Sequence, residues 1–98
     1  MHALLTMFTL GPGKREIADK LGDQFSAALA SMTGFKTMTM FGDDVTGEYG
    51  GLSLWESKED GESALAATGA KLDEALRGIL KGEPKRGVYE VWGVFEAE

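Results

Sequence analysis

Few side chains in this sequence could perform acid–base, nucleophilic or metal chemistry. His2 is the single histidine among 98 residues, and the chain has no cysteine. A histidine could act as a general base near neutral pH, but a position beside the N-terminus favours a solvent-exposed residue or one at a dimer edge. One histidine without cysteine disfavours a transition-metal site. Ser53 and Ser57 have no neighbouring base in the sequence, so nothing supports nucleophilic catalysis, and we assign no catalytic residue.

Two short motifs have simpler explanations than a ligand site. The segment GDD at 42–44, with Glu48, could hold a hard cation, but it lacks the alternating ligands of a calcium loop and is typical of a hairpin tip. The segment GPGK at 11–14 lacks the spacing of a phosphate-binding loop, and Glu16 would place negative charge beside the helix amides. We interpret it as a turn that leads into a helix.

The aromatic residues, with the small residues near them, are the remaining candidates for ligand binding. Trp55 ends a predicted strand in which Gly51 and Ser53 share its face. Small residues on a sheet face allow either the close approach of a helix or a cavity, and a tryptophan N–H at the rim of an apolar cavity suits a flat aromatic ligand. Burial in the core is the simpler explanation of both tryptophans, and both interpretations stay open here. The predicted substrate contacts are Trp55, Trp92, Ser53, Met38 and Phe25.

Hydrophobic periodicity predicts six elements in the order β-α-β-β-α-β. Apolar residues recur at three- and four-residue steps in two segments, and they alternate or cluster in four others. This order is typical of the ferredoxin-like α+β fold, an antiparallel four-stranded sheet with two helices on one face. The length fits a single domain, 1–98. The predicted strands are 2–10, 35–43, 49–56 and 87–96, and the predicted helices are 14–32 and 58–80.

The second predicted helix has clear start and stop signals. Ser57 occupies the N-cap position with Asp60 three residues later, a carboxylate variant of the capping box. Gly69 costs about 1 kcal/mol relative to alanine inside a helix, so we expect a kink or two shorter helices. Gly82 and Pro84 predict the end of the helix.

The sheet face that the helices leave uncovered is predicted to be apolar. Alternation places Phe35 and Phe41 on one face of the second strand, and Met38 and Met40 on the other. The last strand carries apolar residues on both faces: Val88, Trp92 and Val94 on one, and Tyr89, Val91 and Phe95 on the other. The exposed apolar area of such a face would be larger than that of the patches that monomers usually carry. We therefore predict a homodimer in which two sheets pack face to face.

The net charge of −6 disfavours nucleic acid as a partner. Lysine and arginine are scattered, whereas phosphate backbones and acidic lipids require a concentrated basic surface. The N-terminal apolar run at 2–10 is far shorter than the ~20 residues of a membrane span, and it lacks the basic flank and cleavage site of a signal peptide. We expect a cytoplasmic protein that binds neither nucleic acid nor membrane.

The segment LSLWESKEDGESAL, together with the closing VYEVWGV, resembles the antibiotic biosynthesis monooxygenase-like group of dimeric α+β barrel proteins. The shared features are a third strand that ends in Trp-Glu-Ser and an acidic helix start directly after it, and the resemblance covers nearly the whole chain. It implies two ferredoxin-like subunits whose sheets pack into a barrel. It also implies a cofactor-independent monooxygenase acting on a small aromatic or quinol-type molecule between sheet and helices, with Trp55 among the contacts.

The haem-degrading branch of that group fits the sequence less well. Trp55 matches, but the resemblance implies an iron-binding histidine where this chain has Leu65, and the chain has no asparagine for the first strand. We therefore expect no haem and no other cofactor. The alternative to an oxygenase is a non-catalytic dimeric ligand-binding or structural protein. A further alternative is an isomerase or decarboxylase of the same group that uses His2 or a carboxylate as its base.

Overall fold

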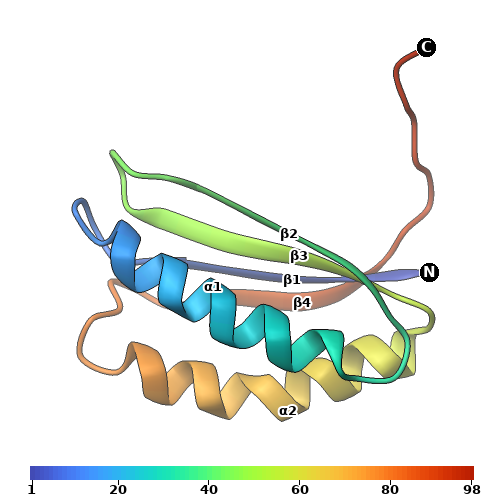
Figure 1. The fold of residues 1–98 in the computed structure, drawn as a ribbon, viewed down its shortest axis with the longest axis horizontal. Coiled ribbons are helices and arrows are strands. Elements are labelled where there is room, and N and C mark those ends of the chain that lie inside the picture. Colours follow the sequence, from blue (N-terminus) through green and yellow to red (C-terminus); the bar gives the residue numbers. More distant parts are fainter.

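The computed structural model describes residues 1–98 and confirms the predicted order of elements (Figure 1). The strands are β1 (His2–Thr9), β2 (Phe35–Asp43), β3 (Glu48–Trp55) and β4 (Lys85–Glu90), and the helices are α1 (Arg15–Ala30) and α2 (Lys58–Leu76). Neither helix is both long enough and apolar enough to cross a membrane.

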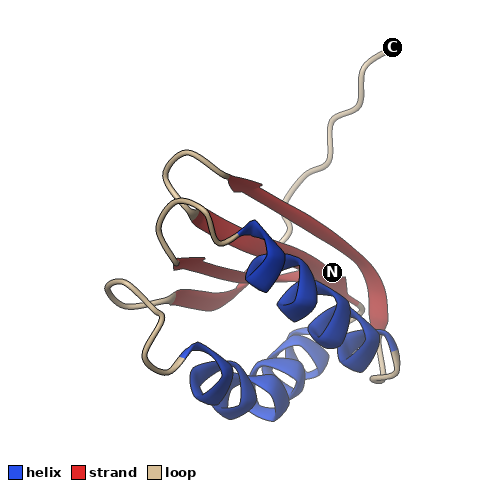
Figure 2. Ribbon diagram, turned by 60° about the vertical axis from the view of Figure 1, so that its left-hand side comes forward, coloured by secondary structure: helices blue, strands red, loops and turns tan.

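The strands form one antiparallel sheet in the order β2-β3-β1-β4. Both helices lie on the same side of this sheet, and Figure 2 shows the helix layer separated from the sheet layer. This is the predicted ferredoxin-like α+β fold. Side chains therefore alternate between a helix-facing side and a face that nothing in the subunit covers, which we call the open face.

The core between helices and sheet consists of two clusters of buried side chains. The hairpin-end cluster lies near the connection between β2 and β3 and contains Leu10, Leu21, Tyr49, Leu72 and Leu76. The Trp55 cluster lies at the other end of β3 and contains Leu4, Leu29, Trp55 and Ala64. The space between the two clusters becomes important for the site.

Trp55 points toward the helices and is completely buried. Its indole Nε1 donates a hydrogen bond of 2.8 Å to Ser53 Oγ, which lies on the same side of β3. Its ring meets Phe35 edge to face, with centroids 5.5 Å apart. Since its polar atom is bonded inside the protein and its ring is packed, Trp55 has the contacts of a core residue.

The predicted faces of β2 are wrong at its first residue. Phe35 pairs with Trp55 and Thr37 pairs with Leu54, so the register shifts around Lys36. An extra residue in one strand reverses the alternation beyond it. Phe35 therefore packs on the Trp55 cluster together with Met38, and not on the opposite face as predicted.

The start of α2 is confirmed, and its interior and end differ from the prediction. Ser57 Oγ accepts a hydrogen bond of 3.1 Å from the backbone N–H of Asp60, as a capping residue does. The helix runs without interruption through Gly69. It ends at Leu76 rather than near residue 80, because Gly78 adopts a left-handed conformation with φ of 83°.

Arg86 of β4 contacts α2 at Gly69 and Asp73. The guanidinium donates to the Gly69 carbonyl oxygen at 3.2 Å and contacts Asp73 at 2.6 Å. A Cβ atom at residue 69 would lie 3.4 Å from Arg86 Nη1, an ordinary van der Waals distance. The contacts of the guanidinium connect β4 to α2, and the geometry does not require glycine at residue 69.

The last strand ends at Glu90 and not at residue 96 as predicted. The N–H of Val91 still donates to the Met1 carbonyl oxygen at 3.0 Å, but the neighbouring strand β1 begins at His2 and offers no further partner. Residues 91–98 therefore leave the sheet as an extended C-terminal segment (Figure 1). Trp92 and Phe95 on this segment are 87% and 86% exposed.

The open face is apolar along its centre. Strand register places Leu52 there between Leu5 of β1 and Thr39 of β2. Phe41 reaches over Gly50 of β3, where a Cβ would lie 3.1 Å from its ring. The large apolar side chains of this face are Leu5, Met7, Phe41, Leu52, Leu54 and Tyr89.

Candidate functional site

A cavity of about 400 Å³ lies between α1 and the helix-facing side of the sheet. Strands β1, β2 and β3 form its floor, α1 forms its roof, and Thr68 and Leu72 of α2 form a side wall. It is situated between the hairpin-end cluster and the Trp55 cluster, because both contribute to its lining. Clefts that hold small molecules have volumes of roughly 300–1,000 Å³, so the size is sufficient for a small ligand.

Small residues explain why the core is open at this place. Thr6 and Gly51 face each other across β1 and β3 in the floor. Gly22 of α1 lies in the roof, where a Cβ would collide with the sulfur of Met40. At Gly51 a Cβ would lie 2.6 Å from the Met38 methyl group. The two glycines let the methionine side chains of β2 lie close to α1 and β3, and no large side chain fills the centre.

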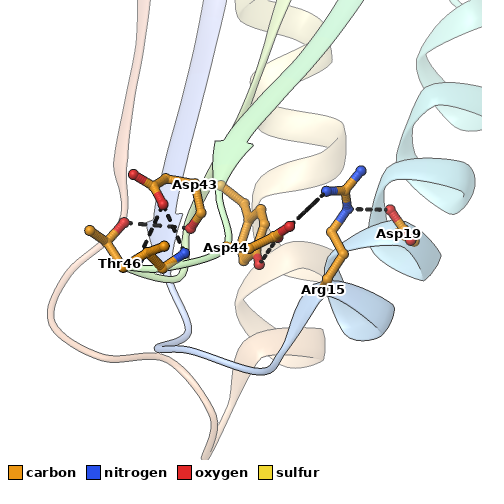
Figure 3. Close-up of polar contacts among 7 residues, drawn as sticks. Arg15, Asp19, Asp43, Asp44 and Thr46 are labelled. Carbon is orange, nitrogen blue, oxygen red and sulfur yellow. Dashed lines mark hydrogen bonds and ion pairs between the residues drawn. The ribbon is translucent and has the colours of Figure 1, made fainter.

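The cavity opens to solvent beside a polar cluster at the hairpin end of the sheet. Arg15 and Asp19 line the cavity, and their side chains are more than half exposed. Arg15 Nε contacts Asp19 at 2.9 Å, and Arg15 Nη1 contacts Asp44 at 3.3 Å. Figure 3 shows Arg15 between these two carboxylates. Tyr49, which is buried, donates its hydroxyl to Asp44 Oδ1 at 2.7 Å. We call these four residues the polar entrance.

The hairpin tip is shaped so that Asp44 reaches the entrance. Asp43 Oδ1 accepts hydrogen bonds from the N–H groups of Val45 and Thr46, at 2.8 and 3.3 Å (Figure 3). Such a bond pattern is typical of an aspartate that stabilises a turn. Gly47 follows with a φ of 76°, and any Cβ there would collide with the backbone of Gly11. The turn therefore packs against the end of β1 and fixes the position of Asp44.

Hydrogen bonding shifts the pKa values of Asp44 and Tyr49 away from neutral pH and so reinforces their ordinary protonation states. The bond from Tyr49 holds the pKa of Asp44 below its ordinary value, and the charge of Arg15 acts in the same direction. The same bond, together with burial, raises the pKa of Tyr49. Asp44 is therefore an anion and Tyr49 a neutral donor near neutral pH.

We expect the Tyr49→Phe variant to raise the pKa of Asp44 toward its ordinary value, because the variant removes the largest cause of the shift. A carboxylate with a lowered pKa stabilises the folded state above its unfolded pKa, and this stability is lost as the pH falls through the folded pKa. In the wild type, the stability that the Asp44 carboxylate gives to the folded state should therefore be lost below about pH 4. NMR titration of the Asp44 carboxyl carbon checks the shift. The matched control is Tyr89→Phe on the open face; an unchanged Asp44 titration in Tyr49→Phe would contradict the assignment.

The structure brings two of the five predicted substrate contacts to the cavity. Ser53 forms part of the floor and Phe25 part of the roof. Trp55 and Met38 lie outside the lining and pack in and against the Trp55 cluster. Trp92 lies on the C-terminal segment, because β4 ends before it.

The polar entrance was not predicted from the sequence. Arg15 has no role assigned there, and Asp44 appears only in the hairpin-tip segment 42–44. Their contact joins residues 29 positions apart, so no local spacing indicates it. Tyr49 follows Asp44 within the same hairpin. This short separation was the one feature of the sequence that could have indicated a contact between the two residues.

His2 lies outside the cavity. It pairs with Trp55 on one side and Glu90 on the other, and its Nδ1 is buried without a hydrogen-bond partner. It does not line the cavity. No group of three or more histidine, cysteine or acidic side chains in the chain is arranged to hold a metal ion.

Several solved structures have the same fold over nearly their whole length. SnoaB, a cofactor-independent oxygenase from Streptomyces nogalater, is 19% identical with a TM-score of 0.75, over 98% of this chain and 97% of that one. A Streptomyces coelicolor monooxygenase, solved with nanaomycin D, is 19% identical with a TM-score of 0.78, over 99% and 92%. A protein named antibiotic biosynthesis monooxygenase is 10% identical with a TM-score of 0.74, over 95% and 100%. The chain has the antibiotic biosynthesis monooxygenase fold.

These similarities are structural. No protein-family model and no curated protein matches the chain in sequence. At identities of 10–19% the monooxygenase fold is shared, while the chemistry depends on the side chains around the cavity.

The residues present do not fit a haem group on this monooxygenase fold. Helix α2 contains no histidine. Leu65, at the position where the resemblance implies an iron ligand, packs with its apolar side chain against the Trp55 cluster. The cavity lining likewise offers no histidine or cysteine.

Proposed function

We propose that this protein is a cofactor-independent monooxygenase for a small aromatic or quinol-type molecule. The observation that carries the proposal is the largely apolar cavity between α1 and the sheet in a chain with the monooxygenase fold. A cavity with an apolar interior and a few polar groups at one end suits a flat ring system with polar substituents. In this proposal the ligand lies beside Thr6 on the floor and beneath Phe25.

The reaction proposed needs little covalent chemistry from the protein. In such a monooxygenation one atom of O₂ enters the substrate as a carbonyl oxygen and the other leaves as water. The substrate loses two hydrogens and supplies all four electrons, beginning from its own anion. The protein then contributes by excluding water, orienting the ring and offering hydrogen bonds. Leu4, Phe8 and Leu29 are the apolar side chains of the lining that would exclude water.

Arg15 is suited to meet an anionic oxygen of such a substrate. Its Nε and Nη1 contact the two carboxylates of the polar entrance, whereas Nη2 makes no hydrogen bond within the chain. A guanidinium offers donors in a fixed plane and stays protonated, and contact with Asp19 raises its pKa further. Arg15 would therefore stabilise the deprotonated form of a ligand at the entrance.

Oxygen uptake with a panel of dihydroxynaphthalenes and anthrones tests the proposal. We expect turnover of at least one compound by the wild type. The Phe25→Trp variant, which places a larger ring in the roof, should lower kcat/KM by about 10- to 100-fold because it displaces the substrate. The matched control is Gln24→Trp, which introduces the same side chain at the neighbouring exposed position. Absence of oxygen uptake with the whole panel would reject the oxygenase proposal.

One observation favours the non-catalytic alternative. No unpaired acid–base group is present among the lining side chains, because Asp19 pairs with Arg15 and Tyr49 donates to Asp44. A ligand-binding protein requires no such group. Binding of the panel compounds without oxygen uptake would support this alternative. An isomerase or decarboxylase with His2 as base has less support, because His2 does not line the cavity.

We further propose that the protein is a cytoplasmic homodimer formed through the open face. The apolar residues of that face, with Phe41, Leu52 and Tyr89 at 41%, 37% and 48% exposure, would be covered by the same face of a second copy. Packing of two sheets face to face is a common arrangement, and it leaves the cavity on the other side of each sheet accessible. The lack of cysteine is compatible with a reducing compartment.

A further inference from the structure

The hydroxyl of Thr6 is the one side-chain hydroxyl in the cavity lining with no hydrogen bond in the protein. Four hydroxyl groups line the cavity, those of Thr6, Tyr49, Ser53 and Thr68. Tyr49 donates to Asp44 at 2.7 Å, and Thr68 donates to the Ala64 carbonyl oxygen at 2.7 Å. These bonds use the proton of each hydroxyl, so neither can donate to a ligand without breaking a contact.

Ser53 is also engaged within the protein. Its Oγ accepts the bond from Trp55 Nε1 at 2.8 Å and lies 3.5 Å from the Leu4 carbonyl oxygen, to which it donates. Its side chain is almost completely buried. Ser53 therefore serves the packing of Trp55, although it forms part of the cavity floor.

Thr6 lines the cavity and is partly exposed. Register with Gly51 and Arg86 places it on the helix-facing side of β1. The one buried side-chain polar atom without a partner is His2 Nδ1, so Thr6 Oγ1 is not sealed in the core. A free hydroxyl on an apolar floor is a donor and an acceptor for whatever occupies the cavity.

The position of Thr6 fits a ligand that enters from the polar entrance. Along the floor the paired residues are Phe8 with Tyr49, then Thr6 with Gly51, then Leu4 with Ser53. A step of two residues along a strand covers about 7 Å. A ring system that enters past Tyr49 therefore reaches Thr6 after roughly the length of two fused rings. Gly51 opposite Thr6 has no side chain of its own, and the Met38 methyl group lies over it, so the ligand would approach on the Thr6 side of the floor.

We propose that Thr6 binds an oxygen substituent of the ligand, so that the site selects ring systems with a hydroxyl or carbonyl group over unsubstituted rings. This rests on the proposed use of the cavity for an aromatic molecule and names the residue that recognises its oxygen. Thr6 orients the ligand and takes no proton from it. An unsubstituted ring would leave the hydroxyl without a partner in an apolar site, which is unfavourable.

Calorimetric binding of 1-naphthol and naphthalene to the wild type and to Thr6→Val tests the assignment. Valine has nearly the shape of threonine and suits a strand, so the cavity keeps its form. A neutral hydrogen bond contributes about 0.5–1.5 kcal/mol. We therefore expect Thr6→Val to weaken 1-naphthol roughly 2- to 12-fold. Naphthalene should bind the variant as tightly as the wild type or more tightly, because valine has no hydroxyl to leave without a partner. Thr6→Ser, which keeps the hydroxyl, should retain most of the 1-naphthol affinity.

The possible outcomes separate this inference from the proposed function. Unchanged 1-naphthol affinity in Thr6→Val, or equal losses for both rings, would reject the role of Thr6 while the cavity remains a ligand site. If the wild type binds neither ring, the proposed function and the role of Thr6 both fail. Melting temperatures of the variants show whether a loss of affinity comes from altered folding.

Discussion

Trp55→Ala is expected to lower the free energy of unfolding by about 3–5 kcal/mol, because it removes a completely buried ring and leaves a cavity. A domain of this size has a total stability of only about 5–15 kcal/mol, so the variant should be severely destabilised. Loss of the N–H also removes the hydrogen-bond donor to Ser53 and the ring that packs against Phe35. Urea denaturation measures the change.

Two control variants define the cause of that loss. Trp55→Phe keeps an aromatic ring but deletes the N–H, and we expect a loss of about 1–3 kcal/mol. Trp92→Ala makes the same replacement at an 87% exposed position and should change subunit stability by less than about 0.5 kcal/mol. A Trp55→Ala protein as stable as Trp92→Ala would contradict the core assignment.

The same variants distinguish a core role from a ligand role for Trp55. Because Trp55 does not line the cavity, Trp55→Phe should leave the affinity for 1-naphthol within about twofold of the wild type, since no ligand contact is removed. Loss of binding with an unchanged melting temperature would show instead that the indole contacts the ligand.

Leu52→Asp is expected to convert the proposed homodimer into a monomer. Leu52 lies at the centre of the open face, between Leu5 and Thr39. Face-to-face packing of two copies would bury a carboxylate from each subunit in an apolar interface, and like charges brought together there cost several kcal/mol. Since each 1.4 kcal/mol is tenfold in affinity, the dimer dissociation constant should rise by about 100-fold or more. Analytical ultracentrifugation over a concentration series measures it.

The matched control for this prediction is Ala27→Asp, which adds the same charge at an exposed position of α1. It should leave the dissociation constant unchanged, because α1 lies on the opposite side of the sheet (Figure 2). A wild type that sediments as a monomer at micromolar concentration would reject the homodimer. A Leu52→Asp protein that remains dimeric would place the interface elsewhere, for example on the C-terminal segment with Trp92 and Phe95.

Local sequence signals predicted the elements of the fold well. Ser57 accepts the predicted cap bond from the Asp60 N–H, the apolar steps of α1 give the expected helix, and the turn residues between β2 and β3 give the expected hairpin. These features depend on residues within one or two turns of each other, so they are visible in a linear chain. The order of six elements then leaves few arrangements other than the ferredoxin-like sheet.

Predictions failed where partners distant in sequence decided the structure. The apolar segment around Trp92 has the composition of a strand, but β1 begins at His2 and provides no ladder for it. Gly69 was expected to interrupt α2, but Arg86, 17 residues away, hydrogen-bonds to its carbonyl oxygen. A one-residue irregularity at Lys36 moved Phe35 to the helix-facing side. Secondary-structure propensity predicts none of these effects, since each depends on a neighbouring element.

By itself the sequence determined the element order, the helix cap before α2, and small residues at Gly51 and Ser53 on the face of Trp55. Only the tertiary structure decided that Trp55 is buried beside the cavity, that Ser53 satisfies its N–H, and that Thr6 keeps a free hydroxyl. The physical reason is that a hydrogen-bond donor or acceptor acquires its role from what it faces across the core. Whether a polar group is satisfied within the protein or left for a ligand depends on contacts that the chain makes only when folded.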